Sequence, residues 1–144
     1  MSPYFYSILF LFSGTIAQVQ TTDNTASVDS IFPATLFIFE GSDWCSNCKR
    51  LKNNILQDSS FLYALQKQQI KIESIDFPQR KKLSKETLEY NAAIAEKYDF
   101  QGIFPTLVLA EIGGETYEVI YYNNESHSEL LSIILAKQQT LLHE

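Results

Sequence analysis

Two cysteines separated by two residues have the clearest chemical potential in this sequence. They are Cys45 and Cys48, in the segment WCSNC. Disulfide exchange requires one ionised, accessible sulfur and a second sulfur close enough to attack the mixed disulfide before the client dissociates. A spacing of two residues at the start of a helix meets both requirements. We therefore expect Cys45 to be the nucleophile and Cys48 the resolving cysteine.

The environment expected around Cys45 favours its thiolate. Unpaired backbone N–H groups and the helix dipole stabilise a negative charge at the start of a helix. Thiolates in such settings have a pKa of roughly 3.5 to 7.5, against about 8.5 for a free cysteine. Basic residues in 49–52 add to this effect. The reduction potential stays open, because Ser46 and Asn47 lie between the cysteines and such residues tune the couple.

The preceding segment predicts a strand and a turn that lead into this helix. Residues 34–40, ATLFIFE, form a short apolar run that is typical of a strand buried on both faces. The turn-forming residues 41–43 end the strand. An amphipathic helix is expected to begin close to Cys45, because apolar residues recur there at helical spacing; these residues are Cys48, Leu51 and Ile55.

The segment after residue 57 predicts a second helix and a second strand. Asp58 and Ser59 have the chemistry of an N-cap. Residues 70–77 alternate apolar and polar side chains, as a strand does, and Pro78 ends the pattern. The apolar face expected for this helix consists of Phe61, Leu62 and Leu65.

The remaining chain predicts a helix, two strands and a final helix. A basic connection, QRKKLSKE, precedes the first of these helices, and residues 102–112, GIFPTLVLAEI, contain a buried strand. Gly113 and Gly114 predict a hairpin turn, and Ser126 and Glu129 have the spacing of a capping box. The apolar faces expected for the two helices are Leu88, Ala92, Ala95 and Tyr98, and Leu130, Ile133, Ile134 and Leu141.

This order predicts an α/β fold in which helices flank a central mixed sheet of four to five strands. The chain has 144 residues, enough for one packed domain. Its net charge of -6 argues against nucleic acid as a partner. Two cysteines supply half of a four-ligand zinc site, and His127 and His143 lack the spacing of a metal motif. We expect no metal and no cofactor besides the redox-active disulfide.

The N-terminal segment resembles a secretory signal peptide. Residues 1–17 form a short apolar run that closes on small residues, although no Lys or Arg precedes it. An uncleaved membrane anchor or a buried helix is the alternative. We expect a signal peptide at 1–17, a linker at 18–30, a folded domain at 31–144 and a periplasmic or secreted location.

With its cysteine motif placed between a buried strand and a helix, the sequence resembles the thioredoxin family. Its second signature is GIFPT, in which Pro105 matches a proline that follows a cis peptide bond and lies against the active-site disulfide. The resemblance implies that the segment of Phe104 and Pro105 contacts substrate. Trp44, next to Cys45, is expected to shield the site and contact substrate, and Asp43 to support it. The segment DWC is similar to the C-terminal domain of DsbD-type membrane thiol reductases. The likeness to small bacterial envelope thioredoxin-like proteins covers about residues 34–122.

Two features depart from the family. Thioredoxins commonly carry a buried aspartate six residues before the first cysteine, and this position is Phe39 here. Glu40 should point to the opposite face of the strand, because side chains alternate, so the usual proton acceptor is expected to be missing. Residues 18–33 are short and weakly patterned, which predicts an abbreviated or absent first strand. The basic connection suggests docking to an acidic partner, although a solvated loop is the commoner reason for such a segment.

Three classes of function follow from the cysteine pair. The first is an extracytoplasmic thiol-disulfide oxidoreductase that reduces or relays protein disulfides, works as a monomer and is recycled by a separate electron donor. The second is a client- or metal-binding module without turnover. The third is a structural domain with a static disulfide.

Overall fold

The computed structural model describes residues 34–141. The expected signal peptide at 1–17, the linker at 18–30 and any strand before residue 34 lie outside the described residues. No helix within 34–141 is long and apolar enough to cross a membrane.

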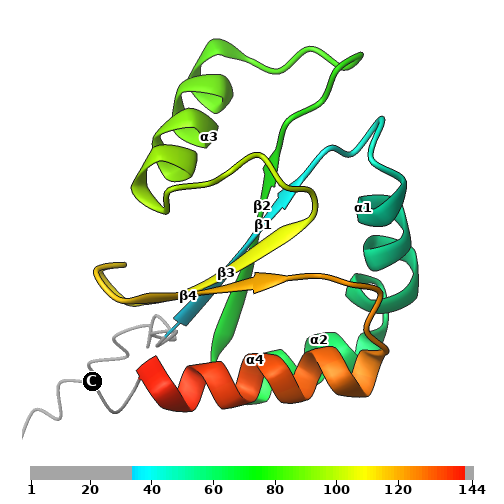
Figure 1. Ribbon diagram of the computed structural model, residues 1–144, viewed down its shortest axis with the longest axis vertical. Helices are drawn as coiled ribbons and strands as arrows, with labels where there is room; N and C mark the ends of the chain where they lie inside the picture. The colour runs from blue at the N-terminus through cyan, green and yellow to red at the C-terminus, as the bar shows by residue number, and fades with distance from the viewer. Residues whose placement is uncertain (1–33, 142–144) are drawn as a thin grey trace, which may run out of the picture.

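Four strands form one mixed sheet with the order β2-β1-β3-β4 (Figure 1). β1 pairs with β2 in parallel and with β3 in antiparallel orientation, and β3 pairs with β4 in antiparallel orientation. The expected mixed sheet of four to five strands is therefore confirmed for the described part of the chain. The strands are β1 (Ala34–Glu40), β2 (Ile70–Asp76), β3 (Thr106–Glu111) and β4 (Tyr117–Tyr121).

Helices cover both faces of this sheet. One face carries α1 (Ser46–Leu51) with its π-helical continuation η1 (Lys52–Leu56), together with α2 (Ser59–Lys67) and α4 (His127–Leu141). The other face carries α3 (Lys85–Lys97), as Figure 1 shows. We refer to them as the α1 face and the α3 face. The order of helices and strands is the one that the sequence predicts.

β1 lies inside the sheet and alternates between two apolar layers. Leu36 and Ile38 pack into the core of the α1 face, whereas Phe37 and Phe39 pack into the core of the α3 face. All four residues are buried. The continuous apolar run predicted for this strand is therefore explained by helices on both sides.

The helix after Cys45 buries the expected residues but changes its geometry part way along. Cys48, Leu51 and Ile55 are all buried. The chain begins as α1 and then widens to η1, where the N–H of Gln57 donates to the carbonyl of Lys52 at 3.0 Å. The apolar pattern does not distinguish these geometries, because the same three residues face the core in either one.

Two predicted apolar faces are partly wrong. Leu62 of α2 is 41% exposed, Leu88 of α3 is 53% exposed, and Ala92 is also exposed. Ala95 and Tyr98 of the predicted face do pack against the sheet. Asn91 joins them in place of Leu88 and Ala92, because its Nδ2 donates to the carbonyl of Asp76 at the end of β2, at 2.7 Å.

The predicted caps and the hairpin turn are confirmed. The carboxylate of Asp58 accepts hydrogen bonds from two backbone N–H groups at the start of α2, at 2.7 and 3.2 Å. Ser126 and Glu129 form a reciprocal box, in which the N–H of Ser126 donates to the Glu129 carboxylate at 2.8 Å. Gly113 and Gly114 both have positive φ, +93° and +68°, which glycine adopts without strain.

Candidate active site

The register of the sheet brings the ends of three strands to one edge of the molecule. Glu40 of β1 lies opposite Asp76 of β2, and Phe39 lies opposite Thr106, the first residue of β3. The segments at these ends carry every site residue that the sequence predicts. These residues are Asp43, Trp44, Cys45 and Cys48 after β1, and Phe104 and Pro105 before β3.

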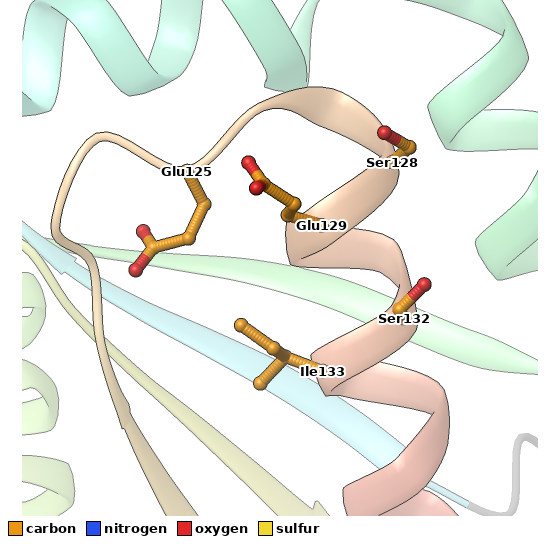
Figure 2. A pocket seen from close by; sticks show the side chains of 5 residues that line it. All are labelled: Glu125, Ser128, Glu129, Ser132 and Ile133. Carbon is orange, nitrogen blue, oxygen red and sulfur yellow. The ribbon is translucent and has the colours of Figure 1, made fainter.

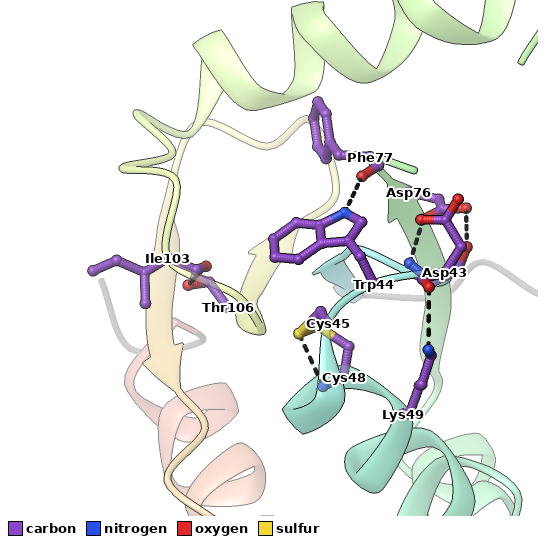
Figure 3. The surroundings of a disulfide bond; sticks show 10 residues. Asp43, Trp44, Cys45, Cys48, Lys49, Asp76, Phe77, Ile103 and Thr106 are labelled. Carbon is purple, nitrogen blue, oxygen red and sulfur yellow. Dashed lines mark hydrogen bonds between the residues drawn. A yellow bond between two sulfur atoms is a disulfide. The ribbon is translucent and has the colours of Figure 1, made fainter. Parts of the chain in front are cut away.

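Cys45 and Cys48 form a disulfide with their Cα atoms 5.3 Å apart (Figure 3). Cys45 is the N-cap of α1, and its Sγ accepts a hydrogen bond from the backbone N–H of Cys48 at 3.1 Å. Cys45 is 6% exposed and Cys48 only 1%, so Cys45 is the sulfur nearer to solvent. A backbone N–H directed at sulfur favours the thiolate over the thiol when the pair is reduced.

A turn at Gly41 sets where the helix begins. The carbonyl of Gly41 accepts hydrogen bonds from the N–H groups of Trp44 at 3.2 Å and Cys45 at 2.9 Å. A Cβ atom at position 41 would overlap the indole ring of Trp44. Glycine is therefore required at this position for the indole to pack against the turn.

Trp44 is held by a hydrogen bond and by an aromatic cluster. Its Nε1 donates to the carbonyl of Phe77 at 2.8 Å, and its ring meets Phe104 edge-on at a centroid distance of 5.2 Å. Phe104 packs against Phe100, which stacks on Phe39 at 4.4 Å. The cluster therefore joins the cysteine loop, the segment before β3 and the α3 face of β1.

The segment before β3 lies across the site from the disulfide, as Figure 3 shows. The peptide bond between Phe104 and Pro105 is cis, which is the form that the resemblance to thioredoxins implies. Pro105 is buried, while Ile103 is 52% exposed. The hydroxyl of Thr106 donates to the carbonyl of Ile103 at 2.8 Å and closes the turn that leads into β3.

Asp43 ties the cysteine loop to the connection between β2 and α3. Its carboxylate accepts hydrogen bonds from the N–H groups of Gln79 at 2.9 Å, Arg80 at 2.6 Å and Lys81 at 2.9 Å. These bonds, chiefly the one from Gln79, lower the pKa of Asp43 to about 2. Lys49 adds a contact, because its Nζ donates to the carbonyl of Asp43 at 3.1 Å. The basic connection is therefore fixed beside the cysteines.

Glu40 is a site residue whose surroundings the sequence did not predict. It shares strand parity with Leu36 and Ile38, so its side chain enters the α1 face, where the cysteine helix packs. It is 7% exposed, and its Oε1 accepts a hydrogen bond from the Ser74 hydroxyl at 2.5 Å. Phe39 lies on the α3 face instead. Glu40 and Phe39 therefore point to opposite faces of the sheet, as the alternation of side chains along a strand predicts.

The turn of residues 41–44 separates the end of β1 from Cys45. Phe77 and Ser74 were missed, because a carbonyl acceptor and a hydroxyl donor leave no distinctive pattern in a sequence.

Outside the cysteine edge, we considered a surface hollow and possible metal sites among the described residues. A surface hollow of about 450 Å³ lies along α4 and the loop before it, and no cysteine or histidine lines it (Figure 2). Within residues 34–141, no group of three or more His, Cys, Asp or Glu side chains is placed to hold a metal ion. The hollow is lined by Glu125, Ser128, Glu129, Ser132 and Ile133.

A curated relative shares sequence with part of this chain. The disulfide bond reductase DsbH of Chlamydia pneumoniae is 35% identical over 83 residues, which are 58% of this chain and 48% of the relative. The matched part thus spans about half the length of that relative. No protein-family model matches the chain.

Solved structures resemble the chain more broadly. A structure of a DsbH oxidoreductase has a TM-score of 0.67 at 24% identity, covering 75% of this chain and 74% of that one. The reduced C-terminal domain of DsbD from Neisseria meningitidis has a TM-score of 0.52 at 14% identity, covering 78% and 88%. A thioredoxin from Thermus thermophilus has a TM-score of 0.51 at 14% identity, covering 75% of both chains.

These likenesses agree with the mixed sheet and its flanking helices. The predicted thioredoxin-like fold is confirmed, and with it the resemblance drawn from the sequence. This chain has a thioredoxin-like fold and shares sequence with part of a disulfide bond reductase.

Proposed function

We propose that this protein is a thiol-disulfide oxidoreductase that works outside the cytoplasm and reduces or relays protein disulfides. The observation that carries the proposal is the hydrogen bond from the Cys48 N–H to Cys45 Sγ at the first turn of α1. This contact favours a thiolate on the more exposed of two adjacent sulfurs. A static disulfide would instead predict no reactive thiolate on Cys45 after reduction.

The reaction begins with the reduced pair. The Cys45 thiolate attacks one sulfur of a client disulfide, which forms a mixed disulfide and releases the other client sulfur as a thiolate that takes up a proton. Cys48 then loses its proton and attacks Cys45 Sγ. The client leaves as a dithiol with two electrons gained, and the Cys45–Cys48 disulfide remains. A separate dithiol donor must reduce this disulfide for the next turnover.

Glu40 is the group that accepts the proton from Cys48 in this scheme. Its carboxylate is buried in the α1 face, where α1 packs, and the Ser74 hydroxyl holds it in place. A carboxylate on the face where the cysteine helix packs is suited to general-base catalysis of the second step. Cys48 is 1% exposed, so bulk water has poor access to it.

The surrounding residues shape the approach of the client. Trp44 and Phe104 pack edge-on at one side of the disulfide, and they offer an apolar contact for the residues next to a client cysteine. Ile103 and Pro105 lie in the facing segment, which leaves the exposed Ile103 available to an incoming peptide. Asp43 supports this arrangement by fixing the neighbouring connection.

The direction of electron flow is supported by the relative. The partial relative from Chlamydia pneumoniae is described as a disulfide bond reductase. A reductase needs a couple that equilibrates near the thioredoxin potential of about -270 mV and not near the value of about -120 mV for DsbA. The apolar run at residues 1–17 supports the location, because it resembles a signal peptide.

Insulin reduction by dithiothreitol tests the activity. Wild-type protein is expected to accelerate the precipitation of insulin chains, and Cys45→Ser is expected to abolish the acceleration. An equal rate with wild type and with Cys45→Ser would overturn the proposal. Equilibration of the purified protein with glutathione then tests direction, because a strongly oxidising potential would contradict a reductase.

A further inference from the structure

We propose that four basic side chains beside the disulfide form a docking surface for an acidic polypeptide segment of the client. This basic rim consists of Lys49 on α1 and Arg80, Lys81 and Lys82 on the connection between β2 and α3. The inference rests on the proposed function, since it assigns a partner chemistry to the same site.

Asp43 gathers the basic rim at the cysteines. Its carboxylate binds the backbone N–H groups of Arg80 and Lys81, and its carbonyl accepts a hydrogen bond from Lys49 Nζ. Asp43 stands two residues before Cys45 in the sequence. The segment from 80 to 82 is thereby held at the edge where a client disulfide must arrive.

The side chains of the basic rim are available to a partner. All four are exposed, and within residues 34–141 none of them forms an ion pair with a carboxylate. Two carboxylates at this edge are already engaged elsewhere. Asp43 binds the connection, and Asp76 accepts hydrogen bonds from the N–H and hydroxyl of Ser42 at 2.9 and 2.7 Å.

The distribution of charge over the chain also supports docking of an acidic partner at the basic rim. The chain carries a net charge of -6, yet most of its 11 Lys and Arg residues fall in 49–52 and 80–85. This clustering of positive charge favours the approach of an acidic partner to the basic rim. Such steering raises association rates by about 10-fold to 1,000-fold and weakens as salt is added.

The position of the disulfide favours a polypeptide over an anionic membrane surface. Cys45 is only 6% exposed, so a client must bring its cysteine close to the turn that carries Trp44. A flexible acidic segment can contact the basic rim while the neighbouring cysteine reaches Cys45. A flat bilayer pressed on the same side chains would cover the sulfur.

Stopped-flow reduction of two model peptides tests the inference. Both contain the same disulfide loop, flanked in one by aspartate and glutamate and in the other by serine and glutamine. Reduced wild-type protein is expected to react about tenfold faster with the acidic peptide at low salt. In Arg80→Gln/Lys81→Gln/Lys82→Gln the ratio should fall towards one, whereas Lys67→Gln/Lys71→Gln/Lys97→Gln, a charge-matched control, should keep it.

The outcomes separate this inference from the proposed function. Because each variant is compared on two peptides, a general loss of activity or folding divides out of the ratio. A ratio of one in wild type, or an unchanged ratio in the variant of residues 80–82, overturns the docking surface while the oxidoreductase stands. Reduction of neither peptide by wild type overturns the proposed function itself. Rim-dependent binding to anionic vesicles without a preference for the acidic peptide assigns the surface to lipid and also overturns the inference.

Discussion

The carboxylate of Glu40 accepts a hydrogen bond from the hydroxyl of Ser74 at 2.5 Å, across the paired strands β1 and β2. Both side chains lie on the α1 face, where apolar residues otherwise form the core. Burial of a carboxylate in such a layer is costly unless its oxygens find donors. The role proposed for Glu40 as proton acceptor for Cys48 gives such a buried carboxylate a function and can be tested.

Replacement of Glu40 by glutamine should slow the second chemical step and spare the first. The amide keeps the size of the side chain but cannot take a proton from Cys48. General-base catalysis contributes at least about 10²-fold, so resolution of the mixed disulfide should slow by about this factor. Single-turnover quenching with an alkylating reagent measures both steps, and the mixed disulfide should accumulate in the variant.

The control for this experiment is Glu73→Gln. Glu73 belongs to the same strand as Ser74, but it points to the other face and bonds the hydroxyl of Tyr90. Equal rates of resolution in wild type and Glu40→Gln would show that water or another group takes the proton.

The hydrogen bonds between Asp43 and the β2–α3 connection predict that the stability of the protein depends on pH. The pKa of Asp43 is lowered from 3.8 to about 2 in the folded protein by hydrogen bonds from backbone N–H groups, led by that of Gln79. Its contribution is therefore complete above pH 3.8 and is lost as the pH falls towards 2. The unfolding free energy of wild type should fall more steeply over this range than that of Asp43→Asn.

Urea unfolding at several pH values measures this difference. Asp99→Asn is the matched control, because Asp99 is an exposed aspartate at the end of α3 with φ of 47°, which asparagine tolerates. Its slope should follow that of wild type. If the unfolding free energies of wild type and Asp43→Asn fell equally steeply with pH, the hydrogen bonds of Asp43 would not form in solution.

Neighbouring residues of α2 differ sharply in burial, although the sequence pattern predicts both on one face. Phe61 is fully buried, whereas Leu62 is 41% exposed. Phe61→Ala should lower the unfolding free energy by about 3 to 5 kcal/mol, because it leaves a cavity in the core. Leu62→Ala should change it by no more than about 0.5 kcal/mol. Similar losses for both variants, measured by urea unfolding, would contradict the packing described for α2.

The fold was predictable because its signals are local and mutually consistent. Asp58 and the pair of Ser126 and Glu129 mark helix starts through cap chemistry, and Gly113 and Gly114 mark the hairpin. The side of a helix that meets the sheet was less predictable. Asn91 turns α3 towards the end of β2, and only the presence of a free carbonyl there explains why a polar residue is buried.

Gly41→Ala tests whether the indole of Trp44 packs against the turn at Gly41. The added Cβ would overlap the indole, so the ring must move and lose its hydrogen bond to the carbonyl of Phe77. The expected cost is about 1 to 3 kcal/mol, as for other overpacked sites. Because Trp44 is the single tryptophan, its fluorescence emission reports the displacement directly.

Gly113→Ala separates contact from backbone strain in this test. Gly113 has φ of +93°, and no atom lies within 4 Å of the place that a Cβ would occupy, so alanine there should strain the turn without moving Trp44. If the fluorescence emission were unchanged in Gly41→Ala, or shifted equally in both variants, the packing of Trp44 against Gly41 would be contradicted.

The site residues that belong to a recognisable motif were predictable from their type and spacing. Cys45, Cys48 and Pro105 occupy one edge of the sheet, as expected from WCSNC and GIFPT. The burial of Glu40 and its hydrogen bond to Ser74 were not predictable, because they depend on the pairing of β1 with β2. The bonds that Asp43 makes to the β2–α3 connection depend on residues 36 to 38 positions away.

Trapping of the mixed disulfide tests the central claim most directly. Cys48→Ser keeps the attacking sulfur but removes the resolving one, so incubation with a disulfide-bonded peptide should yield one covalent adduct per protein. Mass spectrometry of the digest should place this adduct on Cys45, and Cys45→Ser should yield none under the same conditions. An adduct that forms equally through Cys48, or none with Cys48→Ser, would contradict Cys45 as the nucleophile of a disulfide exchange reaction.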